Sequence, residues 1–190
     1  MLVIGNGESR KELNLNTFDD VKIGCNAIAR DVNVDHLVCV DRRMVNEALE
    51  NNFKNNIYTR HDWLGQFKKF KNVKPVPKLP YQGDLRMDHP FQWGSGPYAV
   101  LLSTIYAKRI RMIGFDLHSN SDTVNNIYKD TSNYDKSNKR AVDPRYWIHQ
   151  IAKVFELFPK KKFTIYQTHD WILPDQWKFK NVSVDTIDNL

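Results

Sequence analysis

The chain has 190 residues, a hydrophobic fraction of 41% and a formal net charge of +6, which suits one globular domain spanning residues 1–190 with a sizeable core. No apolar run is long enough to cross a bilayer, and the N-terminus lacks the pattern of a signal peptide, so we expect a cytoplasmic protein. The positive charge suits an anionic ligand, a nucleic acid or an acidic membrane surface equally well, and it identifies no partner by itself.

The first half of the chain alternates short apolar runs with polar turns. Runs rich in β-branched and aliphatic residues predict strands over residues 2–4, 21–25, 36–40 and 56–59. A helix is predicted between the last two of these strands, because apolar side chains recur there on one face at Met44, Val45, Ala48 and Leu49. The lysine- and proline-rich stretch over 69–90 is then expected to run along the surface.

The second half continues the alternation. Gly94-Ser95-Gly96-Pro97 opens a strongly apolar helix, with Pro97 in the first turn, where its missing N–H is not needed. The remaining predicted elements are a strand over 110–115, a helix beginning at Asp143, a strand over 163–166 and a short strand near 182–184. Strands that alternate with helices predict a Rossmann-like α/β fold, with a mostly parallel sheet and helices on both faces.

One polar segment interrupts this pattern. Residues 117–142 have little apolar content and are too many for an ordinary connection. Segments of this kind are usually active-site lids or binding loops, or else disordered. We therefore expect a lid over a site that is built on the sheet.

The first strand leads directly into the loop Gly5-Asn6-Gly7-Glu8-Ser9. Glycines give the backbone freedom where it turns sharply or approaches a ligand, and Ser9 can cap a following helix. Such loops at the carboxyl ends of parallel strands bind nucleotides and sugar phosphates. The loop predicts a phosphate-binding site, with a simple tight turn as the structural alternative.

Four of the predicted strands end in polar residues at the same structural place, and these residues are Asn6, Asn26, Asp41 and Asp116. In a parallel sheet such positions lie along one rim. The second glycine-rich loop, around Ser95 and Gly96, would add free backbone N–H groups at the same rim. The sequence therefore predicts a ligand crevice, for which the candidate nucleotide-binding residues are Gly5, Asn6, Gly7, Ser9, Asn26, Asp41, Ser95, Gly96 and Asp116.

Over roughly its first 120 residues the chain resembles the bacterial lipooligosaccharide sialyltransferases, which use a CMP-activated sugar. The family begins with a strand and a Gly-Asn-Gly-x-Ser loop, matched here by residues 5–9, and its next element ends in a Cys-Asn pair, matched by Cys25-Asn26. A Ser-Gly pair that opens a long helix is matched by Ser95-Gly96, and the Gly-x-Asp end of the next strand by Gly114-Phe115-Asp116.

The resemblance implies a metal-independent glycosyltransferase of sialyltransferase-like type. It would need no cofactor beyond its substrates, a nucleotide sugar and a glycan or other hydroxyl acceptor. The residues that the resemblance places along the cytidine-nucleotide site are Asn6, Ser9, Asn26, Ser95 and Gly96. The family's use of lid tyrosines suggests Tyr128 and Tyr134 as donors to the leaving phosphate.

The chain departs from the family at the general base. Family members carry a histidine in the lid a few positions after a tyrosine, whereas residues 133–137 read Asn-Tyr-Asp-Lys-Ser. His118, two residues beyond Asp116, is the best remaining candidate, since an unperturbed imidazole acts near neutral pH. Two alternatives stay open: a catalytically reduced relative that binds a nucleotide or sugar, and a basic nucleic-acid-binding protein, for which no recognised motif is present.

Overall fold

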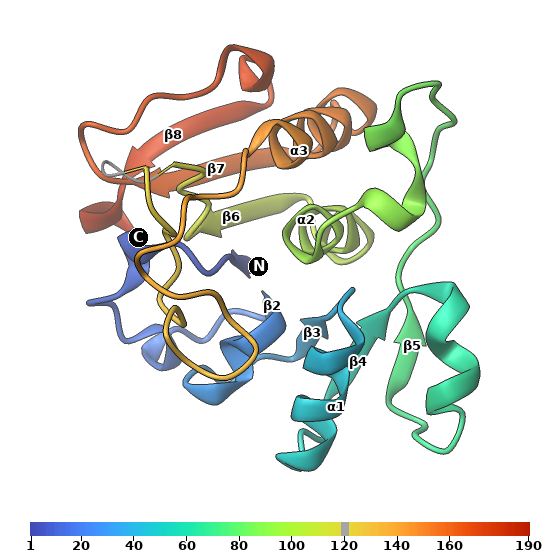
Figure 1. Ribbon diagram of the computed structural model, residues 1–190. Coiled ribbons are helices and arrows are strands. Elements are labelled where there is room, and N and C mark those ends of the chain that lie inside the picture. The colour runs from blue at the N-terminus through green and yellow to red at the C-terminus, as the bar shows by residue number, and fades with distance from the viewer. Residues whose placement is uncertain (119–121) are drawn as a thin grey trace.

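The computed structural model describes residues 1–118 and 122–190. They form a single eight-stranded sheet in which all neighbouring strands are parallel (Figure 1). The strands, in their order across the sheet, are β5 (Val73–Pro75), β4 (Asn56–Thr59), β3 (His36–Val38), β2 (Lys22–Cys25), β1 (Leu2–Ile4), β6 (Arg109–Ile113), β7 (Lys162–Gln167) and β8 (Val182–Thr186). The predicted Rossmann-like α/β fold is confirmed.

The order of the strands reverses beside β1. The chain lays down β1 to β5 in one direction, and then places β6, β7 and β8 on the other side of β1. Ile4 at the end of β1 therefore pairs with Ile113 at the end of β6. Where the strand order reverses, the connections diverge and leave a crevice at the carboxyl edge of the sheet.

Helices cover both faces of the sheet, as predicted. α2 (Ser95–Tyr106) and α3 (Arg145–Leu157) pack on one face, and α1 (Arg42–Glu50) packs on the other with several short 3-10 turns. Alternate residues of β1 face these two layers, because side chains of a strand point to opposite sides: Val3 belongs to the α2–α3 core, and Leu2 and Ile4 belong to the core under α1.

The short edge strand β5 lies inside the stretch that was expected only to run along the surface. It has three residues, and Lys74 and Pro75 are exposed. An edge strand needs pairing on one side only and tolerates proline, so its sequence carries no alternating apolar pattern. Its existence follows from hydrogen bonding to β4.

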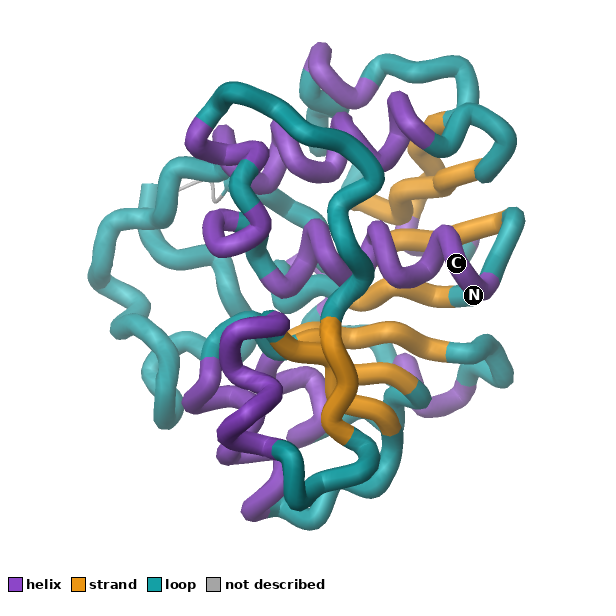
Figure 2. The backbone as a smooth tube through the Cα atoms, turned by 90° about the vertical axis from the view of Figure 1, so that its right-hand side faces the viewer, coloured by secondary structure: helices purple, strands orange, loops and turns teal. Residues whose placement is uncertain are grey.

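The long connections gather at the carboxyl edge of the sheet. In Figure 2 the loops crowd the left of the molecule, whereas the N-terminus lies at the right, where β1 begins. The described part of the expected lid, from Asp122 onward, crosses over the N-terminal residues in Figure 1. Within residues 1–118 and 122–190, no helix has the length and apolar character needed to cross a membrane.

Candidate functional site

A cleft of about 320 Å³ lies at the carboxyl edge where the strand order reverses. It is lined by eight of the nine predicted nucleotide-binding residues, namely Gly5, Asn6, Gly7, Asn26, Asp41, Ser95, Gly96 and Asp116. Apolar walls come from Phe115, Trp147 and Ile151. The fold thus brings together residues from four strand ends and from the start of α2.

The N-terminus of α2 opens into this cleft. Among the described residues, the backbone N–H groups of Ser95 and Gly96 have no hydrogen-bond partner. The next residue is Pro97, which has no N–H, and the helix has twelve residues whose dipoles add up. The first turn of α2 therefore presents an anion-binding geometry in the wall of the cleft.

Two asparagines complete this wall. Asn26 has the left-handed φ of 54°, which asparagine tolerates better than most residues, and its Oδ1 accepts a hydrogen bond from Ser95 Oγ at 2.8 Å. Asn6 donates from Nδ2 to the Cys25 carbonyl and to the Tyr134 hydroxyl, both at 3.2 Å. Its Oδ1 is buried and has no partner in the described part of the chain. This oxygen is therefore an unmet hydrogen bond within the wall of the cleft, whose accessible donors are the N–H groups of α2.

The first glycine-rich loop differs from α2 because the chain itself binds four of its N–H groups, those of Gly5, Gly7, Glu8 and Ser9, and leaves that of Asn6 without a partner among the described residues. The Ser9 N–H donates to Asp116 Oδ2 at 2.8 Å, Ser9 Oγ donates to Asp116 Oδ1, and the Glu8 N–H donates to Asn125 Oδ1 at 2.8 Å. Gln167 Nε2 also donates to the buried Asp116 carboxylate, at 3.0 Å. Asp116 thus occupies the place where the sequence predicts a phosphate.

The glycines of that loop are explained by close packing. A Cβ on Gly5 would lie 2.2 Å from the Gly114 carbonyl oxygen, and a Cβ on Gly7 would lie 2.4 Å from the Asp116 carboxylate. Gly114 itself has a φ of +73°, which favours glycine. These glycines allow the ends of β1 and β6 to touch.

The two tyrosines of the expected lid are not among the residues that line the cleft. Tyr128 is buried, its hydroxyl donates to Asp31, and it accepts from Arg10 Nη2 at 2.9 Å. The Tyr134 hydroxyl accepts from the Ala27 N–H at 3.3 Å as well as from Asn6. Burial raises the pKa of both hydroxyls. These contacts anchor the segment to the sheet, and their role toward a leaving phosphate stays a prediction.

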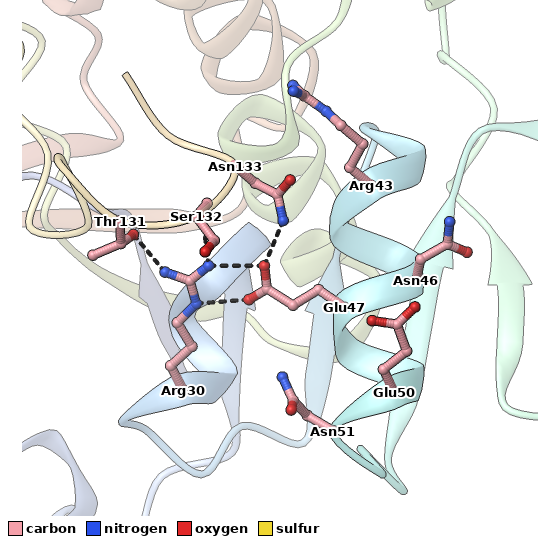
Figure 3. Close-up of a pocket in the computed structure, with 9 residues that line it drawn as sticks. All are labelled: Arg30, Arg43, Asn46, Glu47, Glu50, Asn51, Thr131, Ser132 and Asn133. Carbon is pink, nitrogen blue, oxygen red and sulfur yellow. Dashed lines mark hydrogen bonds and ion pairs between the residues drawn. The ribbon is translucent and has the colours of Figure 1, made fainter. Parts of the chain in front are cut away.

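An ion pair fixes the turn between these tyrosines, as Figure 3 shows. Arg30 forms two hydrogen bonds with the Glu47 carboxylate, at 2.6 and 2.8 Å, and also donates to Thr131 Oγ1 and the Ser132 carbonyl. The hydrogen bond from Arg30 lowers the pKa of Glu47. The hollow beside this pair is distinct from the cleft, and its two central charges neutralise each other.

His118 lies in a second hollow of about 560 Å³ next to the cleft. The two hollows share Asp116 and Asn125, and the second one also includes Ser9, the ninth predicted binding residue. The His118 side chain is exposed, and its carbonyl accepts from Asn125 Nδ2 at 2.7 Å. His118 is therefore placed beside the cleft and not inside it.

Polar side chains of α3 hold the loop that precedes α2, and this role was not predicted from the sequence. Gln150 is buried, donates to the Met87 and Gln92 carbonyls, and accepts from the Gly94 N–H. His149 Nε2 lies 2.6 Å from Asp88 Oδ1. A glutamine among the apolar residues of a helix is the one local signal that pointed to such contacts.

The Asp88 carboxylate that His149 contacts is itself buried and also accepts from the Tyr81 hydroxyl at 2.9 Å. Burial alone would raise the pKa of Asp88, but the hydrogen bonds from His149, Tyr81 and the Leu85 N–H together lower it. This cluster shapes the approach to α2 from outside the cleft.

The charged residue types that line the cleft are acidic. Among the described residues that line it, Asp41 and Asp116 are charged and none is Lys or Arg. Asp41 caps α1, and hydrogen bonds from Arg43 lower its pKa. An anionic ligand group would therefore depend on the N–H groups of α2.

Fold and cleft together define a class of protein: a Rossmann-like α/β protein with a ligand cleft at the reversal of strand order. Comparison of the chain with protein-family models, with curated proteins and with solved structures gave no match in any of the three.

Proposed function

We propose that the chain binds a nucleotide-activated sugar, CMP-linked, in this cleft and transfers the sugar to a hydroxyl group of a glycan or another acceptor. One observation carries the proposal: the free N–H groups of Ser95 and Gly96 line one cleft together with Asn6 and Asn26 at the reversal of strand order. The family resemblance of the first 120 or so residues supplies the nature of the ligand.

The donor would lie with its phosphate against the first turn of α2. Two backbone N–H groups and the positive end of a helix suit a phosphate in a site without Lys or Arg. Asn6 and Asn26 would contact the base or the ribose, because amide groups both donate and accept hydrogen bonds. The apolar wall at Trp147 and Ile151 would cover the ring faces.

The acceptor would approach through the second hollow, on whose wall His118 lies. Its hydroxyl oxygen bonds to the anomeric carbon while His118 takes the hydroxyl proton. The bond from the anomeric carbon to the phosphate oxygen breaks, and the nucleotide leaves with that electron pair. The N–H groups of α2 stabilise the added negative charge, so the step needs no metal ion.

A catalytically reduced relative that only binds the nucleotide or sugar is the second candidate. It is favoured by the engagement of both lid tyrosines, Tyr128 with Asp31 and Arg10, and Tyr134 with Asn6 and Ala27. The two candidates predict the same cleft and differ in the chemistry beside it.

Binding is tested by calorimetry with CMP, and with AMP and UMP for comparison. Asn26→Gly keeps the left-handed backbone and removes the amide, so we expect about a tenfold loss of CMP affinity. Asn52→Gly is the matched control, since Asn52 has a φ of 59° and is exposed outside the cleft. Equal CMP affinity in both variants would contradict the site, and no nucleotide binding at all would contradict the function.

Transfer is tested by release of CMP from a CMP-sugar in the presence of hydroxyl acceptors. We expect His118→Ala to lower this rate at least about a hundredfold with CMP affinity unchanged. His169→Ala is the control, because this histidine is 79% exposed and lines neither hollow. Full activity of His118→Ala would remove His118 as the base, and CMP binding without turnover would favour the second candidate.

A further inference from the structure

The edge of the sheet opposite the cleft carries a cluster of cations. α2 and α3 each precede a parallel strand, so both helices end at the amino edge, where β6, β7 and β8 begin. Basic residues occupy each of these junctions. We call them the basic edge, and they are Lys108, Arg109, Lys160, Lys161, Lys162 and Lys180.

Hydrogen bonds join these three chain segments into one surface. The Lys162 N–H donates to the Lys108 carbonyl at 2.8 Å, and Lys161 Nζ donates to the Ala107 carbonyl at 2.9 Å. The Phe163 N–H donates to the Asn181 carbonyl at 2.9 Å, which places Lys180 beside β7. Arg109 and Lys162 are cross-strand neighbours.

The basic edge accounts for the net charge of the chain. Its six cations equal the formal charge of +6, so the other basic residues are balanced in number by the acidic ones. Among the described ion pairs, none involves a residue of the basic edge. Glu156, the acidic residue closest in sequence to Lys160, pairs with Lys153 instead. Six positive charges therefore lie together on this surface without an acidic partner among the described ion pairs.

Exposed apolar side chains flank these cations at the ends of the two helices. Ile105 is 63% exposed near the end of α2, and Leu157 is 39% exposed at the end of α3. Five of the six cations are lysines, which act as point charges without the planar fork that arginine offers to individual phosphates. Lysines beside exposed aliphatic groups suit an acidic lipid surface better than a nucleic acid.

We propose that the basic edge docks the protein on an anionic phospholipid membrane, with Ile105 and Leu157 entering the interface. The strands run from this edge to the cleft, so a protein docked in this way keeps the cleft open at its other end. Docking is independent of what the cleft binds.

The test is sedimentation of the full chain with vesicles of phosphatidylcholine that do or do not contain phosphatidylserine. We expect binding to the acidic vesicles only, weakened by salt. The triple substitution Lys108→Gln, Lys160→Gln and Lys162→Gln should lower the affinity at least about tenfold. Lys11→Gln, Lys78→Gln and Lys136→Gln form the matched control, because these lysines are exposed, carry the same charge and follow β1, β5 and β6 on the carboxyl side of the sheet.

A separate variant tests the apolar contribution without a change of charge. Ile105→Ser combined with Leu157→Ser should weaken vesicle binding several-fold, while the exposed positions leave the melting temperature nearly unchanged. Equal losses in the two lysine triples would overturn the proposal, since net charge alone would then explain binding. Absence of vesicle binding, or tighter salt-dependent binding to an oligonucleotide than to acidic vesicles, would also overturn it.

Discussion

Two glycine-rich loops meet at the carboxyl edge of this sheet, and they differ in what their backbone donors do. In the first, after β1, the N–H groups of Glu8 and Ser9 donate to Asn125 and Asp116. In the second, before α2, the N–H groups of Ser95 and Gly96 have no partner among the described residues. One loop is closed by a carboxylate of the chain, and the other is open toward a ligand.

The difference shows that a glycine pattern alone does not locate a phosphate site. Gly5 and Gly7 have no room for a side chain, because Gly114, which follows β6, and Asp116 lie against them. A Cβ on Gly96 would meet only Phe115, at 3.5 Å, which is ordinary contact. The same residue type therefore serves packing in the first loop and access to the cleft in the second.

The largest expected loss of stability comes from adding a methyl group to the first loop, and the same substitution in the second loop provides the comparison. Gly5→Ala would place a Cβ against the backbone of Gly114, and we expect a loss of about 4 kcal/mol in the free energy of unfolding. Gly96→Ala should change it by less than about 1 kcal/mol and weaken CMP binding. Urea denaturation and calorimetry measure the two quantities. Similar stability losses in both variants would erase the contrast between the loops.

Removal of the Asp116 carboxylate, which closes the first loop, should lower the free energy of unfolding nearly as much as Gly5→Ala does. Asp116→Ala leaves the donors of the partly buried Ser9 and the buried Gln167 without this acceptor, and we expect a loss of about 3 kcal/mol in the free energy of unfolding. Inorganic phosphate should then raise the melting temperature of this variant more than that of the wild type, because the vacated place suits an anion. An identical response of both proteins to phosphate would show that Asp116 does not stand in for an anion.

Acid should loosen the second loop through the cluster at Asp88. Its pKa is lowered in the folded protein, so its contribution is complete above the unfolded value, about 3.9, and is lost as the pH falls through the lower folded pKa. Asp88→Asn should therefore flatten the fall of the melting temperature below about pH 4. Asp84→Asn, an exposed neighbour, is the control. An unchanged acid profile in Asp88→Asn would exclude this cluster as the cause.

The smallest effect is expected at the ion pair of Figure 3. Arg30 and Glu47 are 24% and 16% exposed, so Glu47→Gln should cost about 1 kcal/mol. Hydrogen exchange should increase at residues 131–133 and in the first loop, with no change at the start of α2. Glu50→Gln, on the same hollow without an ion pair in the described structure, should change neither region. Faster exchange at α2 would mean that the segment after Asp122 also covers the second loop.

Local patterns in the chain were enough to predict most of the fold. The strands at 2–4 and 56–59 have the predicted bounds, and Asp41 caps the helix predicted after it. The spacing of apolar residues follows which face of a helix or strand is buried, and for this reason these elements could be predicted from the sequence. The alignment of strand-end polar residues along one rim follows from parallel pairing, so the cleft could also be anticipated.

Contacts between distant residues decided the rest. Asp116 reaches Ser9 across 107 positions, and Tyr128 reaches Asp31 across 97. Which acceptor a donor binds depends on which distant segments meet in space, and so does the burial of a tyrosine in a polar segment. The local spacing of residues does not encode these meetings. The basic edge arises in the same way, from three lysine-bearing segments that the sheet brings side by side. The sequence alone determined an α/β protein with polar strand ends, and the tertiary structure decided which of its donors remain free.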